Sequence, residues 1–454
     1  NLNKVKIYEF EKTAFRYDRI LYHIGNSEFH VHMFDLLKRY PGTVVLHDLF
    51  LSGVLNFIES QKSASKALHK ALYHSHGYPA LVELRDEDIG KVINKYPSSY
   101  EIFKSAQGVI VHSCYTKDLA EKYFKTNSND IKVIQQLGSN CKILDKKELK
   151  EKLGFPIDSF VVCSFGYLSS YKMNDRLLLA WSKSSLANNN NCYMVFAGDC
   201  LDSGYEARLR NTIEQFKIND RVRITGYLNR ETYQEYLAVA DLAVQLRCNS
   251  RGETSRAIID SLCSKTAVIV NNHGSVTDYP EDIVYKIPDT FEDDELINSI
   301  ELLFKNKALR LTLEQNAVDY SREILEPSRI AKVYHEQIES FAVSHPNSLK
   351  NQLISKIVSE SCKRNYSDRE ILDLSQLIEE NHHRSGCMQL LVDITSLRQQ
   401  DFKTGIQRVG RSILMQLLSN MPEGYRLEPV YRSYEGYRYA VSYTHLTLPT
   451  KRIV

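Results

Sequence analysis

Short apolar runs alternate with amphipathic stretches from about residue 17 to residue 345. The runs are almost continuously apolar, which is typical of parallel strands that helices cover on both faces. The stretches between them, such as 176–183 and 205–216, carry apolar residues at helical spacing. This alternation predicts βαβ units. We predict strands at 20–24, 43–46, 109–111, 160–165, 193–197, 222–224, 242–244 and 268–270.

The predicted strands form two groups, separated by residues 140–158. That segment includes Gly154 and Pro156 and is interpreted as an inter-domain connection. We therefore predict two α/β domains, residues 1–145 and residues 146–342, the second of which ends in helices.

Beyond the second domain the pattern changes twice. Residues 343–386 are polar and charged and are predicted to be a helical linker. A strand at 390–394 and a helix at 413–418 then predict the start of a further α/β domain over residues 387–440, with too little chain to close it. Residues 441–454 do not continue the pattern of the preceding residues and look like translated adapter sequence, so they are given no function.

The bulk composition excludes several classes of protein. A formal net charge of +2 over 454 residues gives no reason to expect nucleic acid as a partner. The local basic cluster of Lys146, Lys147, Lys150 and Lys152 is interpreted as a solvated helix face. No apolar run approaches the roughly 18 residues of a membrane-spanning helix. The nine cysteines are scattered without a Cys-x-x-Cys pair, which indicates free thiols in the cytoplasm.

A polar turn between two predicted strands is the strongest functional signal. The apolar run 241–246 leads into Arg247-Cys248-Asn249-Ser250-Arg251-Gly252-Glu253-Thr254-Ser255, and a helix follows before the strand at 267–270. Ligands bind at such carboxyl ends of parallel strands, and a helix N-terminus attracts anions. Glu253 is unsuited to holding phosphate, so it is expected to bind sugar hydroxyls beside a phosphate held by backbone N–H groups.

This arrangement resembles the retaining glycosyltransferases of family 4. Gly226-Tyr227 before the turn, Glu253 and Asp260 carry the resemblance. The family motif usually has two glutamates separated by seven residues, whereas here six residues separate Glu253 from Asp260. The resemblance implies the GT-B fold, in which two Rossmann-like domains face each other across a crevice. The Gly-Glu-Thr-Ser version is similar to bacterial O-antigen and capsule transferases with several modules in one chain.

The resemblance assigns donor binding to the second domain. Glu253 would bind the donor sugar, with a helix-start acid as the alternative. Asp260 would bind the ribose, or pair with a neighbouring base. Lys172, in the turn after Gly166, would neutralise the diphosphate. Tyr167 replaces the family's arginine there, so Arg247 or Arg251 is expected to supply the second cation. The predicted donor residues are Gly166, Lys172, Arg247, Arg251, Gly252, Glu253, Thr254, Ser255 and Asp260.

The resemblance assigns the acceptor side to the first domain. His47 ends the strand at 43–46 and would contact the donor sugar or the acceptor hydroxyl, oriented by Asp48. Asn26 and His112 follow two other strands, and the alternatives for them are turn and N-cap roles. His47, Glu253 and Lys172 are the predicted catalytic residues. His74 and His76 are poorly spaced for a shared ion, so no metal and no cofactor are expected.

Gly405-Ile406-Gln407-Arg408 resembles the family's glycine-rich loop and would belong to a second transferase module in the same chain. The counterpart for the first module would precede Asn1, so we expect a fragment of a longer protein.

We therefore predict a hexosyltransferase of bacterial polysaccharide synthesis. Its donor would be GDP-mannose or another nucleotide-diphospho-hexose, and its acceptor a glycan or a lipid-linked glycan. It would be cytoplasmic, with peripheral association at the inner face of the plasma membrane. The alternatives are a non-catalytic module that binds sugar nucleotide or glycan, and a sugar-nucleotide epimerase of the same fold.

Overall fold

The computed structural model describes residues 6–62, 65–125, 130–138, 145–344, 367, 369–370, 373–374, 388–395, 397, 405–420, 425–433 and 436–439. Two compact units comprise the chain: residues 1–109 with 120–130 and 341–454, and residues 110–119 with 131–340. The predicted tail at 441–454 and nearly all of the predicted linker at 343–386 lie outside the described residues.

The first strands build a four-stranded sheet in the order β1-β2-β3-β4, in which β1 and β2 run parallel. Its strands are β1 (Leu21–Ile24), β2 (Thr43–Leu46), β3 (Gly108–Val111) and β4 (Ile131–Val133). The helices of this part are α1 (Ile7–Thr13), α2 (Val31–Arg39), α3 (Ser52–Gln61), α4 (Ala67–His76), α5 (Tyr78–Asp86), α6 (Ile89–Lys95), α7 (Tyr100–Ser105) and α8 (Cys114–Phe124).

The second sheet has six parallel strands in the order β10-β9-β8-β5-β6-β7. Its strands are β5 (Phe160–Phe165), β6 (Cys192–Ala197), β7 (Val222–Ile224), β8 (Leu242–Gln245), β9 (Ala267–Asn271) and β10 (Tyr285–Ile287). Its helices are α9 (Lys146–Lys152), α10 (Asn174–Lys183), α11 (Ser203–Gln215), α12 (Arg230–Val239), α13 (Arg256–Cys263), α14 (Asp293–Lys305), α15 (Lys307–Glu323) and α16 (Pro327–Ser344).

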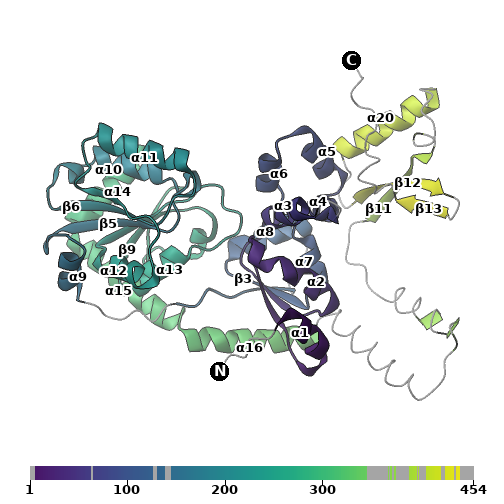
Figure 1. The fold of residues 1–454 in the computed structure, drawn as a ribbon, viewed down its shortest axis with the longest axis horizontal. Helices are drawn as coiled ribbons and strands as arrows, with labels where there is room; N and C mark the ends of the chain where they lie inside the picture. The colour runs from purple at the N-terminus through teal and green to yellow at the C-terminus, as the bar shows by residue number, and fades with distance from the viewer. Residues whose placement is uncertain are drawn as a thin grey trace. The chain divides into compact units, whose positions relative to one another are not determined.

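Helices cover both faces of the six-stranded sheet, with α10, α11 and α14 over one face and α12, α13 and α15 over the other (Figure 1). Alternate residues of β5 point to opposite faces, so Val162 packs with the first helix layer and Val161 with the second. Both faces are therefore apolar, which explains the continuous apolar runs in the sequence.

All eight predicted strands are confirmed, with ends shifted by at most one residue. The prediction missed β4 and β10, which are three residues long and carry a lysine at the centre. Helices α14 to α16 confirm that the chain is helical beyond Phe291, whereas the domain bounds 1–145 and 146–342 stay a prediction.

The basic cluster on α9 differs from the predicted solvated face. Lys150 is only 5% exposed and donates to the carbonyl of Ser159 and to Asp241. Lys146 also pairs with Asp241, and Lys152 pairs with Glu235. The ammonium groups meet acids of α12 and of the loop before β8, so these contacts anchor α9.

The C-terminal elements are β11 (Met388–Asp393), α20 (Gly405–Ser419), β12 (Tyr425–Ser433) and β13 (Gly436–Tyr439). Strand β11 pairs parallel with β12, and β12 pairs antiparallel with β13. The predicted strand and helix are therefore confirmed, although α20 begins eight residues before the predicted start. Strands β12 and β13 were not predicted. Within the described residues, no helix combines the length and the apolar character that crossing a membrane requires.

Candidate functional site

The candidate site lies where the order in which strands are added to the six-stranded sheet reverses. Strands β5 and β8 are neighbours, and the chain proceeds from β5 through β6 to β7 on one side and from β8 through β9 to β10 on the other. This is the switch point of a doubly wound sheet, where the loops at the carboxyl ends diverge and leave room for a ligand. The loops after β5 and β8 carry the predicted donor residues Lys172, Arg247 and Glu253.

The loop after β5 is folded tightly around Lys172. Gly166 has a φ of +90°, and a Cβ built on it would lie 2.5 Å from the Lys172 amine. The ammonium donates to the carbonyl oxygen of Phe165 at 3.2 Å. Burial, together with the Arg247 guanidinium, lowers the pKa of Lys172 to about 8. A partly desolvated ammonium without a carboxylate partner among the described residues is suited to an anionic ligand.

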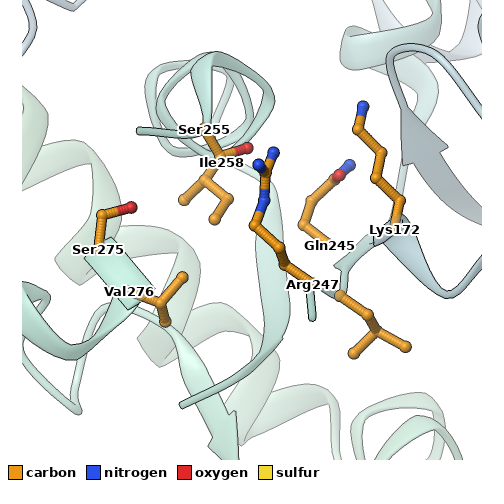
Figure 2. Close-up of a pocket in the computed structure, with 8 residues that line it drawn as sticks. Lys172, Gln245, Arg247, Ser255, Ile258, Ser275 and Val276 are labelled. Carbon is orange, nitrogen blue, oxygen red and sulfur yellow. The ribbon is translucent and has the colours of Figure 1, made fainter. Parts of the chain in front are cut away.

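Lys172 and Arg247 line one pocket at the switch point, with Gln245 between them (Figure 2). The other lining residues come from the ends of β8, α13 and the turn after β9: Leu246, Ser255, Ile258, Ser275 and Val276. Of the two candidate arginines, Arg247 is therefore the one beside Lys172. The guanidinium of Arg251 instead lies 5.8 Å from the centre of the Tyr171 ring.

Glu253 is held by its own loop. Its Oε1 forms an ion pair with the Arg247 guanidinium, and its Oε2 accepts from the backbone N–H of Arg251 at 2.7 Å. The Ser275 hydroxyl donates to the Glu253 carbonyl. A carboxylate has about four lone-pair sites, so Glu253 retains acceptor capacity for a sugar hydroxyl while it orients Arg247.

The remaining residues of the turn lead into the N-terminus of α13. Gly252 has a φ of +91°, a conformation that favours glycine. The Thr254 hydroxyl is buried without a hydrogen-bond partner among the described residues. Ser255 is the N-cap residue of α13, but its side chain makes no capping hydrogen bond. A helix N-terminus without a side-chain cap suits an anion.

A polar clamp that the sequence analysis missed holds this turn in place. The Asn271 side chain accepts from the Arg247 N–H at 2.8 Å and donates to the Arg247 carbonyl at 2.7 Å. His273 Nε2 accepts from the Ser250 N–H at 2.8 Å, and Asp289 lies 3.0 Å from His273 Nδ1. Asp289 also accepts from Asn271 at 3.3 Å. We call Asn271, His273 and Asp289 the strand-end clamp.

Asp260 lies inside α13 and is 8% exposed. It forms an ion pair with Arg256 at 3.0 Å, and the Tyr233 hydroxyl donates to it at 3.4 Å. This ion pair matches the alternative given for Asp260 in the sequence analysis, a helix acid paired with a neighbouring base. A contact between Asp260 and a ribose stays a prediction.

The predicted acceptor residues His47 and Asp48 follow β2, beside the end of β1. His47 Nε2 lies 3.1 Å from His23 Nδ1, with the two rings stacked at 5.3 Å. Burial, and secondarily His30, lowers the pKa of His23. Asp48 accepts from the backbone N–H of Asn26 at 2.9 Å. The structure therefore brings His47 together with His23, which the sequence analysis did not single out, and Asp48 together with Asn26.

The other two acceptor candidates make structural contacts. The Asn26 side chain accepts from the Val54 N–H at 2.8 Å, which holds the first turn of α3. His112 is buried, with Nδ1 2.9 Å from the Ile134 carbonyl oxygen. Contact of either residue with an acceptor, and the predicted crevice between the domains, stay predictions.

Comparison with known proteins gives the site a family context. Residues 145–320 match the family model described as glycosyl transferases group 1. Two matching relatives are described as the serotype-specific mannosyltransferase WbdA of Escherichia coli, with 42% and 43% identity over 84 residues. Those residues are 18% of this chain and only 10% of the relatives' length.

Solved structures share the architecture at low sequence identity. Sucrose-phosphate synthase of Thermosynechococcus elongatus has 18% identity and a TM-score of 0.54, covering 74% of this chain and 77% of its own. HepE of Anabaena in complex with UDP and glucose has 17% identity and a TM-score of 0.53, covering 73% and 81%. The chain has the GT-B fold, with α/β units built on parallel sheets.

Proposed function

We propose that this chain, which carries a glycosyl transferases group 1 domain over residues 145–320, is a retaining hexosyltransferase. It would move a hexose from a nucleotide-diphospho-sugar to a glycan or a lipid-linked glycan. The observation that carries the proposal is the pairing of Lys172 and Arg247 in one pocket at the switch point, with Glu253 at its edge. Two cations beside one carboxylate suit a diphosphate joined to a sugar.

The proposed reaction breaks the bond between the sugar C1 and the β-phosphate oxygen, and the electron pair stays with the diphosphate. The acceptor hydroxyl oxygen then bonds to C1 from the same face, through an oxocarbenium-like state. Its proton passes to the departing phosphate oxygen. Lys172, Arg247 and the N–H groups at the start of α13 would stabilise the growing negative charge. Glu253 would hold a donor hydroxyl, and no metal or cofactor is required.

The acceptor would be bound by the first domain. His47 is the proposed contact to the acceptor hydroxyl or the donor sugar, and the neighbouring Asp48 holds the backbone N–H of Asn26. The stacked His23 ring restricts the orientation of His47. Asn26 and His112 would act from neighbouring strand ends.

Mannose from GDP-mannose is our first proposal for the transferred sugar. It rests on the name of the E. coli relatives, of which only about a tenth is matched. UDP- and dTDP-sugars are the second choice, and the HepE complexes with UDP-glucose support UDP. We also propose O-antigen or capsule synthesis as the setting, at the cytoplasmic face of the membrane. Residues 387–440 would start a second module, as the resemblance of Gly405 to Arg408 implies.

The test is an assay of the chain with a panel of nucleotide sugars and glycan acceptors. Release of nucleoside diphosphate together with a glycosylated product of unchanged anomeric configuration is expected. Release of a free or epimerised sugar without a glycosylated acceptor would instead identify an epimerase.

A non-catalytic sugar-nucleotide or glycan-binding module is the second candidate. One observation favours it: both carboxylate oxygens of Glu253 bind groups of its own loop, the Arg247 guanidinium and the Arg251 N–H. This candidate predicts that nucleotide sugar binds at the pocket and is recovered unchanged with every acceptor.

A further inference from the structure

Gln245 is a buried amide at the centre of the pocket to which neither the sequence nor the comparisons give a role. It is the last residue of β8 and is 6% exposed. Its Nε2 has no hydrogen-bond partner within the described part of the chain. Leaving a buried donor unpaired costs about 1–3 kcal/mol in general. A ligand that supplies the missing acceptor would recover that cost.

The surroundings of Gln245 indicate the charge of that ligand. The Lys172 ammonium and the Arg247 guanidinium, which flank Gln245 in Figure 2, are donors without acceptor capacity. The Phe165 carbonyl already accepts from Lys172, and Glu253 already pairs with Arg247. Two cations and one carboxylate leave a positive surplus. The acceptor that fits is therefore an anionic oxygen.

We propose that the Gln245 amide donates a hydrogen bond to the same diphosphate group that Lys172 and Arg247 bind, as the neutral third donor of the site. The identity of the anion as a sugar-nucleotide diphosphate rests on the proposed function, whereas the anion site itself does not.

A neutral donor suits this position. Arg247 already lowers the pKa of Lys172, and a third cation would disfavour the protonated lysine further. An amide adds a hydrogen bond without that Coulombic cost.

The test is calorimetric titration of the full chain with inorganic pyrophosphate, UDP and GDP. Gln245→Met keeps the approximate volume and removes the donor, and Gln245→Glu keeps the shape and adds negative charge. Gln215→Met, at the exposed end of α11, is the matched control. We expect pyrophosphate and nucleoside diphosphate to bind about tenfold to a hundredfold more weakly to Gln245→Met, more weakly still to Gln245→Glu, and unchanged to Gln215→Met.

Thermal unfolding without ligand separates this role from a structural one. Removing a buried Nε2 group that has no partner among the described residues should leave the melting temperature of Gln245→Met unchanged or higher, while anion binding falls. A structural amide predicts a lower melting temperature with the affinity for anions unchanged, and that result would overturn the proposal.

The remaining outcomes distinguish the two proposals. If both Gln245 variants bind pyrophosphate and nucleoside diphosphate as tightly as the wild type, the proposed role of Gln245 is overturned. The transferase proposal is not affected by that result. Weaker pyrophosphate binding in both variants, without transfer from any donor, supports the anion contact and contradicts the transferase. Gln245→Met could instead bind pyrophosphate as the wild type does and bind nucleotide sugar more weakly. That result would place the amide on the sugar and overturn the diphosphate contact. No binding of any anion to the wild type contradicts both.

Discussion

At the scale of single residues, the pocket depends on charges that are only partly compensated. Lys172 has a lowered pKa because it is buried near another cation, and Arg247 is balanced by Glu253. The family resemblance of the sequence singled out Lys172, and the pattern of strand, polar turn and helix singled out the Glu253 turn. The choice between Arg247 and Arg251 required the three-dimensional arrangement, because it depends on which side chains converge. So did the finding that Gln245 Nε2 has no partner among the described residues.

Replacing Lys172 with alanine should raise the barrier to transfer by on the order of 3 kcal/mol, as for other preorganised groups that stabilise transition-state charge. That corresponds to a loss of roughly a hundredfold in kcat/KM, measured with saturating acceptor. Lys147→Ala, at an exposed position of α9, is the control. Equal activity of the two variants would remove Lys172 from the reaction.

Binding of nucleoside diphosphate should weaken as the pH rises through 8. Because the pKa of Lys172 is lowered to about 8 in the free protein, its ammonium is present below that pH and is lost above it. A bound anion favours the protonated form, so binding takes up a proton above pH 8 and the dissociation constant should rise by up to tenfold per pH unit. Calorimetry at pH 7, 8 and 9 measures this slope. A slope that persists in Lys172→Ala would assign it to another group.

At the scale of elements, the site is two loops fixed to adjacent strands. The strands were predictable because each buried strand is a nearly continuous apolar run. Strands β4 and β10 were not, since Lys132 and Lys286 at their centres break short runs. The strand-end clamp was also not predicted. Asn271, His273 and Asp289 are ordinary polar residues in the sequence, and only the fold shows that they form hydrogen bonds with the turn after β8 and with each other.

Replacing Gly166 with alanine should displace Lys172, because the new Cβ would lie 2.5 Å from its amine. Gly226→Ala is a matched control, since Gly226 also has a positive φ but a Cβ added there would meet no atom within 4 Å. Both substitutions strain the backbone by about 1–2 kcal/mol, which denaturant unfolding would show. Only Gly166→Ala should lose affinity for nucleoside diphosphate; equal losses would mean that backbone strain alone is responsible.

Removing the clamp should loosen the turn that carries Arg247 and Glu253. Asn271→Ala leaves the Arg247 N–H and carbonyl without their side-chain partner, at a cost of about 1–3 kcal/mol for each unpaired group. We expect lower stability and a higher KM for the donor. Asn272→Ala, at the neighbouring exposed position, should change neither quantity. Donor kinetics unaffected by Asn271→Ala would show that the turn holds its shape without the clamp.

At the scale of the molecule, the two units carry different parts of the proposed chemistry. The second unit contains the complete set of predicted donor residues on a sheet with the strand order of a doubly wound fold. In the first, β1 and β2 bring His23 next to His47. The division of labour in the proposal therefore follows the sheets. It predicts that variants of Lys172 and Arg247 in the second unit alter the dissociation constant for nucleoside diphosphate, whereas His47→Ala lowers transfer and leaves that constant unchanged.

The most direct test of the central claim is a crystal structure of the chain with a bound nucleotide-diphospho-sugar. The account predicts the diphosphate within hydrogen-bond distance of Lys172 Nζ and the Arg247 guanidinium, at the ends of β5 and β8, and a sugar hydroxyl on Glu253. A diphosphate bound elsewhere, without contact to Lys172 or Arg247, would contradict it.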